Sequence, residues 1–580
     1  MLERLGKARI VAGPGYNRWR VPPASISIHL CIGSVYAWSV FNPPLTKVLG
    51  VVGSAAGDWE LESVVRIFSV AIVFLGLSAA VAGRWLETVG PRMVGVAAAC
   101  CWGGGFGLGG LGIVTHQLWL LYLGYGVLGG VGLGLGYVSP VSTLIRWFPD
   151  RRGMATGMAI MGFGGGAMIA APLEKWLLGL YYRAPQYLGA AGDVELVNDG
   201  GRRLAHVAGQ LREVVVVGPG DVAAMFQPGP EGIYVVGTGS TGVAAAFFTL
   251  GALYLVVMLA AAFSYRVPAE GWAPSGWVPP SADEAGKKMI TRHHVDIDAA
   301  LRTPQFYLLW IVLCFNVTAG IGVLGVAKTM ITEIFGSTLP GVVDGAFATT
   351  YVLMISVFNM AGRFGWASLS DVIGRKNTYT IFFVLGTALY LSIPYTAQQV
   401  SVSPAVTWLV VFYAATMLIF TMYGGGFATI PAYLADVFGT RFVGGIHGRL
   451  LTAWSTAGVL GPELITRLRA GALREAIDAL VAKIDPAAFE AEFGASPAQL
   501  DALVEAKTVT VAKLMQLAPP GTVDPSSTLY NSTMLVMAGL LVVALGANLL
   551  VRPVDPKHHL RERPGDEPAG GGEPPGGDEP

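Results

Sequence analysis

The stretch DGAFATTYVLMISVFNMAGRFGWASLSD, from Asp344 to Asp371, decides the fold because it is long, apolar and almost free of charge. Between its two terminal aspartates the only charged side chain is that of Arg363. A helix needs roughly 20 apolar residues, at about 1.5 Å each, to cross the hydrocarbon core of a bilayer. The stretch is therefore predicted to span a membrane, with Arg363 about 12 Å from its end and close to the bilayer midplane.

The position of Arg363 demands an explanation. A charge near the midplane costs at least about 2.5–3.5 kcal/mol on insertion scales, so it needs a polar cavity or a partner. We expect no acidic residue deep in any other helix, and we therefore predict that Arg363 binds an anionic substrate. The alternative is a structural arginine that donates to backbone carbonyls of a neighbouring helix.

Similar apolar stretches recur along the 580 residues, which are 53% hydrophobic and 13% charged, whereas soluble proteins carry about 25% charged residues. The sequence predicts an all-α polytopic membrane protein with twelve transmembrane helices in two pseudo-symmetric six-helix bundles. The first apolar run is long and lacks a cleavage site, so it is expected to be a retained helix. The predicted spans are 25–47, 63–82, 93–114, 118–140, 153–173, 241–264, 306–331, 345–368, 378–397, 406–431, 445–466 and 531–551.

Lysine and arginine gather in alternate loops, which predicts that both termini lie on the cytoplasmic side of the cell (inner) membrane. The expected parts are a cytoplasmic N-terminal segment 1–24, an N-terminal bundle 25–264, a cytoplasmic linker 265–305, a C-terminal bundle 306–552 and a disordered cytoplasmic tail 553–580. Two outer insertions are expected, short strands in 174–240 and amphipathic helices in 469–529. We expect each to be structural or to bind a partner.

The loops after the second and eighth predicted spans repeat one pattern, GRWLETVGPR (83–92) and ASLSDVIGRK (367–376). Each places an acid, Glu87 or Asp371, three residues before a glycine and near a base, Arg92 or Arg375. An acid there can hold an arginine or a helix N-terminus of the other bundle in one conformation and release it in another. We predict that these four residues control the conformational change.

The repeated loops resemble the signature of the major facilitator superfamily. Four further stretches are similar to the oxalate:formate antiporter family, which is kin to the monocarboxylate transporters. They are GSVYAWSVFNPPL (33–45), RWFPDRRGMATGMAIMGFGGG (146–166), NVTAGIGVLG (316–325) and YLADVFGTR (433–441). The resemblance covers nearly all of the membrane portion and neither insertion. It implies the major facilitator fold and alternating access.

The resemblance also assigns roles to single residues. It gives Arg363 the role of the substrate arginine of monocarboxylate transporters and puts Asn359 where those proteins carry an acid. Since asparagine cannot carry a proton, coupling stays open between anion exchange and proton symport. Trp454 stands where the oxalate:formate antiporter has a second cation. One cation instead of two favours a monocarboxylate.

A carboxylate held by one arginine needs further hydrogen-bond donors and apolar walls. Tyr36, Tyr137 and Tyr423 lie in predicted spans and are candidates, although each could simply pack between helices. His29 is expected to make a structural bond, and Lys328 is expected to reach the outer surface.

No catalytic arrangement, metal-ligand spacing or nucleic-acid-binding pattern is found in the sequence. We expect no enzyme activity and no cofactor. The prediction is a monomeric secondary active transporter of small organic anions, such as lactate, pyruvate or formate, acting as an anion exchanger or a proton symporter. The alternatives are an oxalate or dicarboxylate exchanger and a transport-inactive carboxylate sensor.

Overall fold

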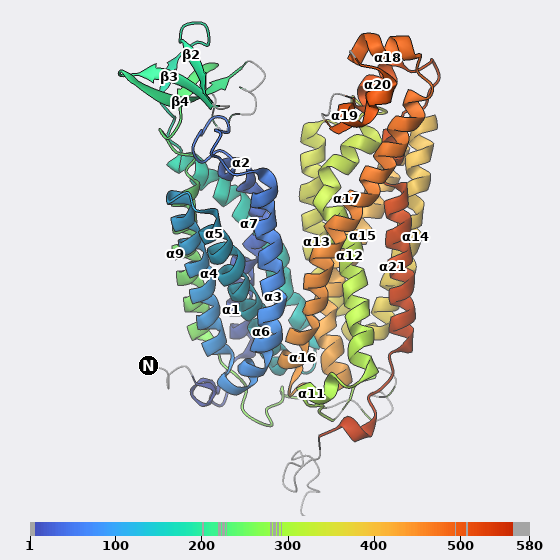
Figure 1. The fold of residues 1–580 in the computed structure, drawn as a ribbon. Helices are drawn as coiled ribbons and strands as arrows, with labels where there is room; N and C mark the ends of the chain where they lie inside the picture. The colour runs from blue at the N-terminus through green and yellow to red at the C-terminus, as the bar shows by residue number, and fades with distance from the viewer. Residues whose placement is uncertain are drawn as a thin grey trace, which may run out of the picture.

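A computed structural model describes residues 6–560, apart from short gaps at 200–201, 219–221, 223–224, 226, 228, 279–280, 282–285, 287–288, 292, 494 and 506–508. Two groups of long helices stand side by side, and each bears a small cap at the upper end of the view (Figure 1). The N-terminus lies at the lower end. Ten helices of the described part are long and apolar enough to cross a membrane.

The first group is the N-terminal bundle. It comprises α1 (Val21–Gly33) with its 3-10 continuation η4 (Ser34–Val40) and α2 (Asn42–Leu45), α3 (Leu61–Val89), α4 (Pro91–Val114), α5 (Leu118–Leu121), the π-helical turns η5 (Tyr122–Gly129), α6 (Gly130–Trp147), α7 (Arg152–Tyr181) and α9 (Val243–Ser264). The turn between α3 and α4 requires Gly90, which has φ 88°.

The second group is the C-terminal bundle. It comprises α12 (Pro304–Phe335), α13 (Gly345–Ile373), α14 (Arg375–Val402), α15 (Val406–Phe438), α16 (Val443–Leu450), α17 (Thr452–Val481) and α21 (Asn531–Leu550). Gly374, with φ 86°, turns the chain between α13 and α14 as Gly90 does in the first group. The repeat seen in the sequence therefore has the same backbone form in both bundles.

Two predicted spans lack the length or hydropathy of the ten long apolar helices. The first is short because α1 ends after 13 residues and continues as a 3-10 helix. The eleventh is α17, whose second half carries charged residues and leaves the bundle to support the upper cap. With these two, the described chain has the predicted twelve membrane segments, arranged as in the major facilitator fold.

The two insertions form the caps. Between 174 and 240 lies an antiparallel sheet of order β1-β5-β4-β3-β2, with β1 (Tyr187–Gly189), β2 (Leu196–Asp199), β3 (Arg202–Val207), β4 (Gln210–Val217) and β5 (Gly232–Val235). The second cap contains α18 (Pro486–Phe493), α19 (Leu500–Glu505) and α20 (Val511–Leu517), which bury Phe489 and Leu514 against Ile477 and Leu480 of α17. The remaining short helices are α11 (Ile297–Ala300), η2 (Lys7–Ile10), η3 (Arg18–Arg20), η6 (Pro497–Gln499), η7 (Pro525–Thr528) and η8 (Pro556–His558).

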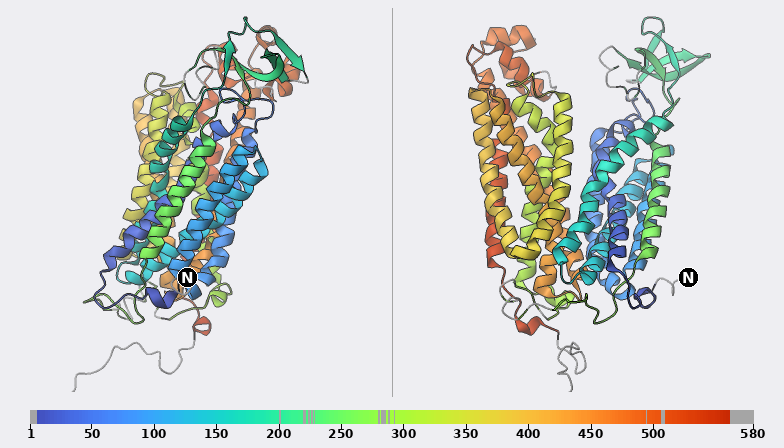
Figure 2. Two further views of the ribbon diagram at one scale, coloured as in Figure 1. Left: turned by 90° about the vertical axis from the view of Figure 1, so that its left-hand side faces the viewer. Right: turned by 180° about the vertical axis from the view of Figure 1, so that it is seen from behind.

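The bundles meet in their lower halves and diverge upward, as both the front and the rear views show (Figures 1 and 2). Helix α7 packs on α13 and α15, and α3 packs on α16 and α17. A Cβ atom on Gly153 of α7 would overlap the carbonyl oxygen of Ala367 in α13. A Cβ on Gly83 of α3 would lie 2.6 Å from the Cα of Gly445 in α16. Glycine is therefore needed at both contacts that close the lower end.

Two sequence expectations differ from the structure. Helix α7 extends beyond residue 173 to Tyr181 and carries Glu174 into the protein interior, so an acid does lie deep in a second helix. The tail was expected to be disordered from 553, but residues 553–560 are ordered against the linker. The amide of Leu560 donates to the carbonyl of His294 at 2.8 Å, and the ring of His559 stacks on that of His293. Residues 561–580 of this expected tail lie outside the described residues.

Candidate functional site

Arg363 lies on α13 at the contact between the bundles and is 1% exposed. Its Nε donates to Oδ1 of Asn359, one turn earlier, at 3.1 Å. Its Nη1 donates to the backbone carbonyl of Ile160 in α7, also at 3.1 Å. Its Nη2 is buried and has no hydrogen-bond partner among the described residues. Gly164 gives the guanidinium room, since a Cβ there would lie 2.7 Å from Nε.

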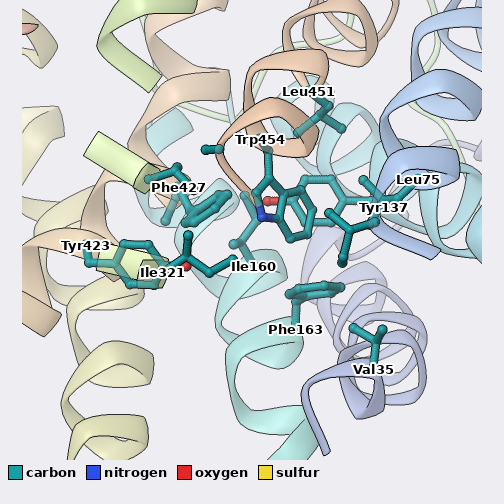
Figure 3. Packing of buried hydrophobic residues seen from close by; sticks show 14 of the residues in the cluster. Val35, Leu75, Tyr137, Ile160, Phe163, Ile321, Tyr423, Phe427, Leu451 and Trp454 are labelled. Atoms are coloured by element: carbon teal, nitrogen blue, oxygen red, sulfur yellow. The ribbon is translucent and has the colours of Figure 1, made fainter. Parts of the chain in front are cut away.

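Aromatic rings surround the guanidinium on two sides. Its Cζ lies 5.8 Å from the ring centre of Phe163 in α7 and 5.4 Å from that of Phe427 in α15, distances at which a cation and a ring attract. The ring of Trp454 from α17 lies between these two, with centroid distances of 5.3 Å and 5.1 Å. Tyr137 packs against both Trp454 and Phe163, at 5.4 Å and 5.3 Å. Figure 3 shows these four rings, from both bundles, packed together.

Several polar groups near Arg363 are buried without a hydrogen-bond partner in the described part of the chain. They are the hydroxyls of Tyr36, Tyr137 and Tyr423 and the indole Nε1 of Trp454. The hydroxyl of Tyr36 is a weak hydrogen-bonding neighbour of the Arg363 guanidinium and of the Tyr423 hydroxyl, without the geometry of the hydrogen bonds given above. All of these groups can donate a hydrogen bond, and buried donors are normally satisfied. An anion would accept from them, and no described carboxylate forms an ion pair with Arg363.

The structure thus brings the predicted residues Asn359, Tyr36, Tyr137, Tyr423 and Trp454 together around Arg363. The alternative interpretation of Arg363 holds for one of its nitrogens, Nη1, which bonds a carbonyl of a neighbouring helix.

Two other residues from the sequence analysis are outside the candidate set, although the ring of His29 lies 5.2 Å from that of Tyr137. His29 makes the structural bond that we expected, with Nδ1 2.6 Å from the carbonyl oxygen of Ala159. Lys328 is exposed.

Below this site, polar contacts between the two bundles hold the lower end closed, and Asp371 makes several of them. The carboxylate of Asp371 accepts from the amides of Gly153 and Met154 at 2.8 and 2.9 Å and from Nη2 of Arg375 at 2.6 Å. Since α7 begins at Arg152, an acid of the C-terminal bundle caps a helix of the N-terminal bundle.

Asp436 adds a second contact across the same interface. It accepts from Nε of Arg375 at 3.0 Å and from Nη1 of Arg152, in the other bundle, at 2.8 Å. Sequence reasoning missed Arg152 and Asp436, and also Phe163 and Phe427, although all four lie in or near stretches with a family resemblance. The residue type of each shows that it could form an ion pair or an aromatic contact, but not which residue of the other bundle it contacts.

Glu87 and Arg92 of the first repeat make different contacts. Glu87 forms an ion pair with Arg146 and lies against Gly444 at the start of α16 in the other bundle. Arg92 instead donates to the carbonyls of Phe263 and Tyr265, where α9 of its own bundle ends. These two hydrogen bonds of Arg92 therefore lie within the N-terminal bundle.

Comparison with known proteins relates this geometry to a family. The chain matches the family model of the Major Facilitator Superfamily over residues 25–192 and 232–462. It is 26% identical to the oxalate:formate antiporter of Oxalobacter formigenes, over 77% of this chain and 84% of that protein. It is 24% identical to apicoplast pyruvate carrier 1 of Toxoplasma gondii, over 73% of this chain and 78% of that protein. The fold is similar to the crystal structure of a bacterial homologue of the iron transporter ferroportin in an outward-facing state, with a TM-score of 0.53, 10% identity and coverage of 91% and 98% of the two chains.

Proposed function

Because the chain belongs to the Major Facilitator Superfamily and is a membrane transporter, we propose that it carries small organic anions by alternating access. The substrates we favour are monocarboxylates such as lactate, pyruvate or formate. One observation carries this proposal: Nη2 of the buried Arg363 is unpaired, and the unpaired groups around it can donate hydrogen bonds. We call this set, with its aromatic walls, the carboxylate cage; its members are Arg363, Tyr36, Tyr137, Tyr423, Trp454, Phe163 and Phe427. The similarity to an oxalate:formate antiporter and to a pyruvate carrier supports the same class of substrate.

The cage supports a specific binding geometry. A carboxylate would accept from Nη2 of Arg363 and from the hydroxyls of Tyr36 and Tyr423, and such charge-assisted bonds are the strong ones. The rings of Phe163 and Phe427 would exclude water and strengthen this pairing. Trp454 fills the place of a second cation, which leaves one positive charge for one carboxylate.

Substrate binding would also act on the contact between the bundles. The bond from Nη1 of Arg363 to the carbonyl of Ile160 joins α13 to α7. A carboxylate that draws the guanidinium upward competes with this carbonyl and weakens one of the bonds that hold the lower end closed. Binding is thereby linked to rocking of the bundles.

The orientation follows from the distribution of basic residues. We place the lower end, with both termini, in the cytoplasm and the two caps outside the cell membrane. In this orientation the described conformation is closed toward the cytoplasm by Asp371, Asp436 and Arg375 and by Glu87 at the related position.

Counterflow in proteoliposomes tests the proposal. Vesicles are loaded in turn with lactate, pyruvate, formate, acetate or oxalate, and exchange of the labelled anion is measured. Arg363→Lys loses the planar fork and one or more charge-assisted bonds, each worth about 1.5–3 kcal/mol, so we expect a roughly 10- to 100-fold loss of exchange with folding retained. Arg467→Lys is the matched control, because Arg467 is exposed on α17 and pairs with Glu463.

Each alternative has its own result. Normal exchange by Arg363→Lys would refute the assignment of Arg363. Exchange of oxalate alone would identify a dicarboxylate exchanger and would mean that Trp454 does not exclude a second charge. Binding of a carboxylate without any exchange would identify a sensor.

A further inference from the structure

A buried acid, Glu174, lies away from Arg363 and the groups around it. Glu174 of α7 is 0% exposed, and neither of its carboxyl oxygens has a hydrogen-bond partner among the described residues. The other buried acid among the described residues is Asp436, which is paired with Arg152 and Arg375. Glu174 thus differs from every other buried acid of the described chain in having no cation beside it.

The surroundings of Glu174 offer little to an ionised carboxylate. The ionisable side chains that it influences are the tyrosines Tyr125 of η5 and Tyr254 of α9, and Cys31 of α1 lies near Tyr254. No described lysine, arginine or histidine forms an ion pair with it. Tyr125 lies in η5, which is π-helical, and α7 also packs on the 3-10 helix η4. π-Helical turns inside α-helices recur at functional sites.

The protonation state follows from this setting. An ionised carboxylate that is both unpaired and removed from water is strongly disfavoured, whereas the protonated acid is neutral and can donate its own hydrogen. In the described conformation, in which the bundles diverge toward the upper end, we therefore expect Glu174 to hold its proton. A conformation that wets this position would release it.

Helix α7 connects Glu174 to the carboxylate cage. Glu174 lies 11 residues beyond Phe163, or about 16 Å higher along the helix. Gly166, Ala170 and Glu174 are buried at four-residue spacing and face the N-terminal bundle, since Gly166 closely approaches Gly33 of α1. Ile160, whose carbonyl accepts from Arg363, lies 14 residues before Glu174 on the same helix. A shift of α7 on substrate binding would therefore change the packing around Glu174.

We propose that Glu174 is the proton-binding site of this transporter, and that one proton on Glu174 accompanies each carboxylate bound at Arg363. The proposal rests on the proposed function. The proton enters from the outer side onto a carboxyl oxygen of Glu174 and leaves to water on the inner side when the carboxylate is released. One anion and one proton cross together, so no net charge moves. Asn359, at the place of the acid in related transporters, cannot supply this proton.

The test compares two assays in proteoliposomes with a substrate that wild-type protein exchanges. In counterflow at equal pH on both sides no net proton movement is needed, so Glu174→Gln, which mimics the protonated acid, should exchange at a rate within about threefold of wild type. With the outside one pH unit more acidic, wild type should accumulate the anion about tenfold, and Glu174→Gln should not concentrate it. Glu463→Gln is the control, because Glu463 is an exposed acid on α17.

Each outcome decides the proposal. If Glu174→Gln accumulates the anion as well as wild type does, Glu174 is a structural acid that never releases its proton, and the proposal is overturned. Counterflow without pH-driven accumulation in wild type would also overturn it but would leave the proposed function standing as anion exchange. If Glu174→Gln fails in both assays, Glu174→Asp decides. Accumulation with a shifted pH dependence supports the proton site, and loss of accumulation in step with exchange overturns it.

Discussion

Replacement of Asp371 by asparagine should open the lower end. Asp371 caps α7 from the opposite bundle through the amides of Gly153 and Met154, and its side chain is only 16% exposed. Asparagine keeps one acceptor oxygen and loses the charge that favours a helix N-terminus. Such a cap contributes about 0.5–2 kcal/mol and the charge about 0.3–1 kcal/mol. We therefore expect the equilibrium to shift by about 1–2 kcal/mol, or roughly 5- to 30-fold, toward the conformation that is open at the lower end.

The assay is a distance measurement between two spin labels on opposite bundles. Thr88 at the end of α3 and Asn377 at the start of α14 are exposed and lie at the lower end. Cys100 is exposed and Cys101 is half-buried, so both are replaced by serine before the labels are introduced. In Asp371→Asn the population with the longer distance should grow relative to the parent protein without substrate.

Asp344→Asn is the matched control because Asp344 caps its own helix, accepting from the amide of Phe347 at 2.7 Å. It should lower thermal stability slightly and leave the distance distribution unchanged. An unchanged distribution in Asp371→Asn, or an equal change in both variants, would refute the role of Asp371 as a cap between bundles.

Two further predictions concern the same end of the molecule. Gly153→Ala should also favour the open lower end, since its Cβ would overlap the Ala367 carbonyl and overpacking costs about 1–3 kcal/mol. Gly365→Ala is the control, because a Cβ at Gly365 meets open space. Equal distributions of the spin-label distance in the two variants would contradict the packing argument. Burial and the neighbouring His293 lower the pKa of His559 from 6.5, so its docking is fully favoured above that value and is lost as the pH falls below it. The amide protection factors at residues 553–560, which are corrected for the fall of the intrinsic exchange rate with pH, should decrease below about pH 6, and a constant protection factor would count against this docking.

The membrane segments were predictable because a bilayer imposes a local rule. Each helix satisfies its own backbone, so an apolar run of sufficient length reveals a span without knowledge of its neighbours. Arg363 stood out for the same reason, as a charge inside such a run. The limits of this rule are seen at Glu174, which was assigned to a loop because the apolar run ends near residue 173, although α7 continues to Tyr181.

The candidate site was only partly predictable. Asn359 shares a helix face with Arg363, so its place beside the guanidinium follows from helical spacing. Phe163 and Phe427 come from two other helices, and nothing in their own segments distinguishes them from packing aromatics. The two backbone amides that Asp371 caps are more than two hundred residues away in sequence, at the start of α7.

The sequence by itself determined that this chain spans a membrane, that its halves repeat, and that a single arginine lies deep within an apolar helix. These properties follow from hydropathy, charge and spacing, which act over one helix at a time. Only the tertiary structure decided which groups surround Arg363, that Arg92 binds within its own bundle while Asp371 binds the other, and that Glu174 is buried without a partner. Each of these depends on how helices from distant parts of the chain pack, because burial and hydrogen bonding between helices are set by the neighbours that the fold supplies.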